Sequence, residues 1–111
     1  MPKRRGERSL ATAAVLFAAL GDETRLRMVA RLGTEGPMSI ARLTEGTEVT
    51  RQAVTKHLHV LEGAGLVRGA RHGRETVWEL EPTQLDEARR YLDRISAQWD
   101  QALDRLKRFV E

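Results

Sequence analysis

The chain has 111 residues, a formal net charge of +3 and no cysteine. This length suits one domain with a single hydrophobic core, and the missing cysteine excludes disulfides, thiolate metal sites and cysteine-based redox sensing. The charge is uneven, since residues 51–74 carry five bases against one acid, whereas residues 75–111 carry nine acids against six bases. A basic surface confined to one part of a domain is typical of a face that meets nucleic acid.

The chain begins with a basic tail, residues 1–8, which includes Lys3, Arg4 and Arg5. We expect this tail to be disordered, with a contact to a phosphate backbone or minor groove as the alternative. The apolar run that follows, residues 10–20, superficially resembles a secretory signal but is too short to span a membrane. Its spacing predicts a structural helix between Ser9 and Gly21, with one apolar side made by Leu10, Ala13, Ala14, Phe17 and Leu20.

A second helix is predicted directly after Gly21, with Asp22 as its N-cap and Gly33 as its end. Its buried stripe is assigned to Leu26, Val29 and Leu32, and residues 34–37 are expected to form a turn.

A third, short helix starts at the cap Ser39, turns Ile40 and Leu43 inward and ends at Gly46. Together with the next helix it spans residues 39–64, which have the pattern of a helix-turn-helix motif.

The fourth helix is predicted to start after Thr50 and to close at Gly63 and Gly65. Spacings of four and three residues fix its buried side on Val54, Leu58 and Leu61. At 100° per residue, the opposite side is polar and hydrogen-bonding, and is made by Gln52, Thr55, Lys56 and His59 with Arg51 at its edge.

Residues 66–81 change to the alternating period of a two-stranded hairpin, or wing, with His72-Gly73 as the two-residue turn. Trp78 and Leu80 share one face and should pack onto the helices. Arg71 and Arg74 flank the tip.

A long helix is predicted over residues 83–110, with apolar residues at alternating intervals of three and four. We favour packing of this seam against a second copy of the chain, and the alternative is that it lies across its own first helix. The expected dimer interface consists of Leu10, Ala14, Phe17, Leu85, Leu92, Ile95, Trp99, Leu106 and Phe109.

Three stretches resemble the ArsR/SmtB family of bacterial winged-helix repressors, namely ALGDETRLRMVARL, TRQAVTKHLHVLEGAGLV and RHGRETVWEL. The resemblance covers the chain from about Leu10 on. It implies a mainly α winged helix-turn-helix fold that dimerises through its terminal helices. It also implies binding to a palindromic operator, usually as a repressor that an inducer releases. The stretch YLDRISAQWDQALDRLKRFVE looks like the branch encoded beside SRPBCC-domain proteins.

The chain departs from that family in two places. The segment SIARLTEG has no thiol, and the last helix has Asp86, Asp93, Asp100 and Asp104 but no histidine, so we predict no metal and no cofactor. Glu48 stands where the turn commonly carries glycine, so either it adopts a left-handed conformation or the turn is built differently.

The resemblance and the helical positions together define a DNA-facing set. Gln52 can pair with adenine, while Arg51 or Lys56 can read guanine or grip phosphate. His57 lies beside the buried stripe, and we favour a packing residue hydrogen-bonded to backbone over a base reader. The full set is Ser39, Thr50, Arg51, Gln52, Thr55, Lys56, His59, Arg71, His72 and Arg74; Ser39 and Thr50 are equally explained as helix caps.

These expectations describe a cytoplasmic, dimeric regulator of transcription that binds double-stranded DNA, most simply as a repressor of its own operon, with an unidentified small-molecule or protein effector. The alternative is a winged-helix module for protein contacts or dimerisation, which would need an apolar or acidic outer face on the fourth helix. We expect no catalysis, because the chain has no cysteine and no glycine-rich phosphate loop, and its acids are spread along a solvated helix.

Overall fold

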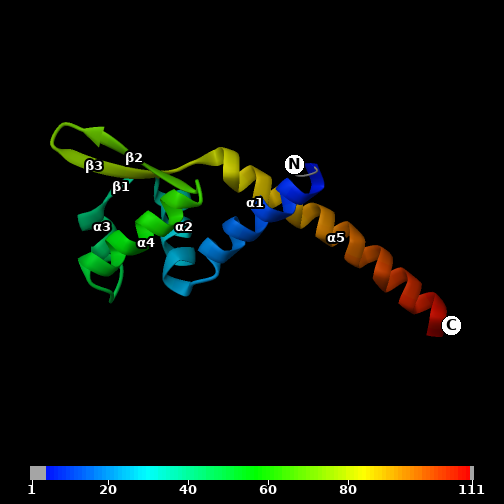
Figure 1. The fold of residues 1–111 in the computed structure, drawn as a ribbon. Helices are drawn as coiled ribbons and strands as arrows, with labels where there is room; N and C mark the ends of the chain where they lie inside the picture. Colours follow the sequence, from blue (N-terminus) through cyan, green and yellow to red (C-terminus); the bar gives the residue numbers. More distant parts are fainter. Residues whose placement is uncertain (1–4, 111) are drawn as a thin grey trace.

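The computed structural model describes residues 5–110 of the chain, as a helical body with a hairpin at one side and one long helix that leaves it (Figure 1). Its elements are α1 (Arg5–Leu20), α2 (Glu23–Glu35), β1 (Met38–Ser39), α3 (Ile40–Glu45), α4 (Arg51–Gly63), β2 (Val67–His72), β3 (Glu75–Leu80) and α5 (Pro82–Val110). The mainly α architecture with a helix-turn-helix and a wing is confirmed. Figure 1 shows α1 crossing the first half of α5 at a steep angle, while the second half of α5 extends away from the body.

The predicted two-stranded wing is confirmed as β2 and β3, but the sheet has a third antiparallel strand that the prediction missed, in the order β1-β3-β2. Met38 pairs with Trp78 and Ser39 with Val77. A strand of two residues is too short to show an alternating period, and only its partner β3 makes it a strand. Through β1, the wing is hydrogen-bonded to the start of the helix-turn-helix.

The turn of the hairpin is shifted by one residue from its predicted place. His72 pairs with Glu75, so the two loop residues are Gly73 and Arg74. Gly73 has a φ of 66°. A two-residue hairpin turn of this kind needs positive φ at its first loop position, which glycine adopts without a steric cost.

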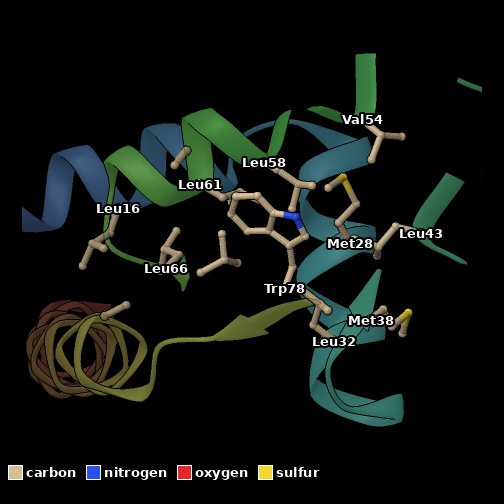
Figure 2. Close-up of a cluster of buried hydrophobic side chains, with 13 residues drawn as sticks. Leu16, Met28, Leu32, Met38, Leu43, Val54, Leu58, Leu61, Leu66 and Trp78 are labelled. Carbon is tan, nitrogen blue, oxygen red and sulfur yellow. The ribbon is translucent and has the colours of Figure 1, made fainter. Parts of the chain in front are cut away.

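The core lies between α4, α2 and β3 (Figure 2). Val54, Leu58 and Leu61 are fully buried, which confirms the predicted inner side of α4. Figure 2 shows the Trp78 indole close to Leu58 and Leu61, so Trp78 is a core anchor as predicted.

The predicted stripe of α2 is wrong at Leu26, whose side chain is 53% exposed. Leu26 and Leu32 are six residues apart, which places them about 120° apart around a helix, so they cannot share one face. Met28 is one turn before Leu32 and is buried instead, with Val29 packed partly against the core.

On α1 the buried side chains are Ala13, Leu16 and Ala19, with Phe17 and Leu20 partly buried. The prediction missed Leu16, the only large side chain among the fully buried ones on this helix. Leu10 and Ala14 were assigned to the same side as Ala13 and are exposed, because each lies more than 100° around the helix from Leu16.

Some helix ends also differ from the prediction. α1 already includes residues 5–8 of the predicted disordered tail and runs through Ser9, because arginine and glutamate are good helix formers; residues 1–4 of that tail lie outside the described residues. α2 continues through Gly33 to Glu35, and Gly36, with φ of 87°, ends it by donating its N–H to the Leu32 carbonyl. The caps Asp22, Ser39 and Thr50 are confirmed.

Candidate nucleic-acid interface

The outer side of α4 is held in place by the helix's buried side and by its N-cap. The Thr50 hydroxyl oxygen accepts a hydrogen bond from the backbone N–H of Ala53 at 3.1 Å. The Thr55 hydroxyl is half-buried and donates to the Arg51 carbonyl at 2.9 Å, so its donor is already used. The remaining outer side chains are exposed, namely Arg51, Gln52, Lys56 and His59.

The turn between α3 and α4 is built without a left-handed residue, since every described residue with positive φ is a glycine outside the turn. Glu48 is therefore not strained, and the turn is built differently from the family pattern. The Thr47 backbone N–H donates to the Thr44 carbonyl at 3.1 Å, and the Thr47 hydroxyl accepts from the Val49 N–H at 3.2 Å. These bonds lead the chain into the cap at Thr50.

The half-buried Ser39 caps α3 by accepting from the Arg42 N–H at 3.2 Å. Ser39 also belongs to β1, so its backbone is paired with the wing. Its structural roles are established, and contact with a ligand remains a prediction.

The basic side chains of this region fall into two groups. Arg68 on β2 pairs with Glu79 at 2.7 Å and Glu81 at 3.1 Å, and its hydrogen bond to Glu79 raises the pKa of the Arg68 guanidinium. In contrast, Arg51, Lys56 and Arg74 are exposed and have no carboxylate within 4.0 Å among the side chains of residues 10–110. Within the helix-turn-helix and the wing, uncompensated positive charge therefore lies at the start of α4, on its outer side and at the wing tip.

At the wing tip, Arg71 donates from Nε to the Gly73 carbonyl at 3.3 Å. This bond braces the turn and leaves the terminal nitrogens of the guanidinium exposed with those of Arg74. His72 is exposed on the same tip.

His59 lies where α4 meets the wing. Its ring stands edge-on to the Trp78 indole, with centroids 6.4 Å apart, and its Nδ1 is 3.5 Å from a Glu62 carboxylate oxygen. The sequence placed His59 on the outer side, but the sequence could not reveal its contact with a tryptophan from another element.

His57 is half-buried, as predicted, with 21% of its side chain exposed. Its partner is not backbone, however. His57 Nδ1 is 3.3 Å from Nη1 of Arg25 and 3.9 Å from the Asp22 carboxylate, both on the α2 side.

The seam of α5 is covered only in its first turns. Leu85 packs partly on the core, Ala88 is buried, and Phe17 of α1 contacts Tyr91 with ring centroids 5.8 Å apart. Further along, Ile95 is half-buried, and the large apolar side chains of α5 are exposed. Two of them, Leu103 and Val110, were not part of the predicted seam. These exposed residues are Leu92, Trp99, Leu103, Leu106, Phe109 and Val110.

The described residues offer neither a metal-binding cluster nor a membrane-spanning helix. Residues 5–110 contain no group of three or more His, Asp or Glu side chains arranged to hold a metal ion. None of their helices has the length and apolar character to cross a membrane.

Three comparisons place this geometry among known proteins. The family model of a helix-turn-helix domain matches residues 20–70. The HTH-type transcriptional regulator Rv2034 of Mycobacterium tuberculosis is 40% identical over 87 residues, which are 78% of this chain and 78% of that protein. An ArsR-like transcriptional regulator from Rhodococcus sp. RHA1 has a TM-score of 0.76 at 37% identity, over 92% of this chain and 95% of that chain.

A third protein is similar in fold alone. The homodimeric winged helix-turn-helix DNA-binding domain of Mycobacterium bovis is 19% identical, with a TM-score of 0.68 over 94% of this chain and 93% of that chain.

Proposed function

The chain belongs to the ArsR family of helix-turn-helix transcriptional regulators, and we propose that it works as a homodimer that binds a palindromic operator and represses its own operon. Family membership makes it a DNA-binding regulator rather than an enzyme. The proposal concerns how this chain reads DNA, how it assembles and what the binding does.

One observation carries the proposed way of reading DNA. Arg51, Lys56 and Arg74 are exposed cations without an ion pair in the described part of the chain, while Arg68 close to them is neutralised by two carboxylates. Unpaired cations gathered on the outer side of α4 and at the wing tip suit a phosphate backbone, which dominates affinity for duplex DNA.

We assign α4 to the major groove and the wing to the backbone or minor groove. Gln52 has the geometry to pair with both hydrogen-bonding positions of an adenine edge, and Arg51 can reach guanine or phosphate. Lys56, Arg71, His72 and Arg74 are assigned to phosphate or the minor groove. The remaining members of the set are Ser39, Thr50, Thr55 and His59; the first two hydroxyls accept from backbone as caps and keep their O–H donor for a phosphate.

The proposed dimer rests on the uncovered seam of α5. Trp99 is 66% exposed and Phe109 is 87% exposed, although both lie on the heptad face that begins against α1. Large apolar side chains aligned along a helix favour a protein interface. A second copy would cover them, with Leu92, Ile95 and Leu106 of the same seam and with Leu10 and Ala14 of α1, which are also exposed.

The C-terminal sequence supports a place in the branch without metal sites that is encoded beside SRPBCC-domain proteins. We therefore propose regulation by an organic ligand or a partner protein. We also propose that the protein works in the cytoplasm, because a regulator of transcription has to reach the chromosome.

The test is selection of a duplex from a randomised double-stranded library by the full chain. The proposal expects an inverted repeat among the recovered sequences and repression of a reporter placed behind it. Recovery of sequences without any common motif would contradict it, and reporter activation would contradict the repressor role.

A further inference from the structure

Arg25 lies in the first turn of α2 and touches two other helices. Its Nε donates to the Ala19 carbonyl at 2.5 Å, and its Nη2 donates to the Ala18 carbonyl at 3.4 Å. Its Nη1 is 3.3 Å from Nδ1 of His57 on α4. One guanidinium therefore binds the last turn of α1 and the side of the recognition helix.

The chemistry of the three groups fits this arrangement. The carbonyls in the last turn of a helix lack an intrahelical partner, so Ala18 and Ala19 offer acceptors. Arginine has five N–H donors in a planar fork and no acceptor. Nδ1 of His57 must therefore accept, which puts the proton of the neutral ring on Nε2.

The remaining contact between α1 and α4 is apolar. Leu16 of α1 and Leu58 and Leu61 of α4 belong to one buried cluster. Apolar packing of side-chain ridges into grooves restricts two helices to a few classes of crossing angle, but it leaves a scatter of about 15–20° within each class. The hydrogen bonds of Arg25 are directional, so they can fix the orientation of α4 relative to α1.

We infer that Arg25 is a positioning residue for DNA recognition, which joins the proposed dimerisation helix α1 to the recognition helix α4 through His57. This inference rests on the proposed homodimer. In such a dimer, the angle between α1 and α4 sets the distance between the two recognition helices. Arg25 then determines which half-site spacing the protein accepts, although it touches no base.

The test measures spacing preference with the full chain. The probe is a duplex selected by the wild-type chain, together with derivatives that have one or two base pairs added or removed at the centre. Arg25→Met keeps most of the aliphatic stem and loses every donor. His57→Leu loses the acceptor but leaves the bonds of Arg25 to α1 in place, so it stays informative if Arg25→Met does not fold.

Two variants serve as controls. His57→Asn places an amide oxygen near the position of Nδ1 and should keep the wild-type spacing preference. Arg27→Met removes an arginine of the same helix that pairs only with exposed Glu23, and it should also keep the preference. Sedimentation of each variant without DNA should give the same dimer.

We expect the wild type to prefer its selected spacing, and Arg25→Met and His57→Leu to lose roughly three- to thirtyfold of that preference. Nitrogen NMR of the free wild type should show the proton of the His57 ring on Nε2. Variants that bind all spacings more weakly by one common factor would overturn the inference while leaving the proposed function intact. A wild-type chain without spacing preference would instead overturn the proposed dimeric reading, and the inference with it.

Discussion

The guanidinium of Arg31 lies where a β-carbon on Gly46 would stand. From there it donates to the carbonyls of Leu43 at 3.1 Å and Arg42 at 3.4 Å, at the end of α3. Gly46 has a φ of −89°, so a β-carbon at this position would strain no left-handed backbone and would instead displace the end of the Arg31 side chain.

Gly46→Ala should therefore push the guanidinium away from α3 and break both hydrogen bonds. We expect a loss of about 1–2 kcal/mol in the free energy of unfolding, measured in urea. Arg31→Met should cost a similar amount. Both changes remove the two carbonyl contacts, and Arg31→Met also removes the pair of Arg31 with Glu35 at 3.1 Å. The double variant should therefore cost clearly less than the sum of the two single losses.

Gly63→Ala is the control for that measurement. Gly63 ends α4, and nothing lies within 4 Å of a β-carbon placed there. Gly63→Ala should leave the free energy of unfolding unchanged or raise it. Fully additive losses in the double variant would show that Gly46 and Arg31 act separately.

Local sequence predicts those parts of the fold whose residues interact within one helix, and it misses those formed by contacts between distant elements. α4 was predicted with its cap and its buried side, because Thr50, Val54, Leu58 and Leu61 interact within one helix or through its spacing. β1 was missed because Met38–Ser39 is a strand only through β3, which is distant in the sequence. The contact of Arg25 with His57 joins residues 32 positions apart, and no periodic pattern marks it.

On α5 the heptad spacing indicated the apolar seam but not what covers it. Of the two alternatives left open by the sequence, cover by its own α1 is found for the first turns of α5, while cover by a second copy remains a proposal for the later turns. Ala88 is buried within the described chain, whereas Trp99 and the turns after it are exposed. The spacing of apolar residues defines the apolar face of α5, while the length of α1 determines how much of that face is buried within the same chain.

The outer residues of α4 should divide their work between affinity and sequence choice. Gln52→Ala should cost about 1–3 kcal/mol on the selected operator, relax the choice of base at one position per half-site, and change the salt dependence little. Lys56→Ala should weaken binding to matched and scrambled duplexes alike and reduce the salt slope by about one per subunit. Titration of both variants against both duplexes checks this, and equal behaviour of the two would refute the division.

The wing offers a matched pair of arginines. Arg74→Ala should lower affinity for any duplex and reduce the salt slope, because this cation has no ion pair within the described residues. Arg68→Ala should cost far less, since Glu79 and Glu81 already offset its charge. A greater loss with Arg68→Ala than with Arg74→Ala would contradict the assignment of the wing tip to DNA.

The exposed seam of α5 should carry the association of the chain with itself. Leu106→Asp puts a charge among the exposed apolar residues and should raise the dimer dissociation constant by about thirtyfold or more, as at an interface hot spot. The control is Gln101→Asp, an exposed polar position five residues before Leu106 and about 140° around the helix from it. Sedimentation equilibrium measures both, and an unchanged dimer with Leu106→Asp would exclude this face.

The cap of α2 should make stability depend on pH. The backbone N–H of Arg25 donates to the Asp22 carboxylate at 3.0 Å, and this bond lowers the pKa of Asp22 below its ordinary value of 3.8. A lowered folded-state pKa means that the stabilisation is fully present above the unfolded pKa and is lost as the pH falls through the folded one.

Asp22→Asn keeps a capping oxygen without this titration. The difference in free energy of unfolding between the wild type and Asp22→Asn should therefore shrink as the pH falls below 3.8. Urea titrations across that range measure it. A difference that grows as the pH falls below 3.8 would contradict the assigned pKa direction.

The mass of the complex between the full chain and its selected duplex tests the central claim most directly. Two chains should bind one duplex, with protected half-sites one helical turn apart, about 34 Å, or a multiple of it. A complex with a single chain, or a chain that shows no preference for any duplex even at low ionic strength, would contradict the account.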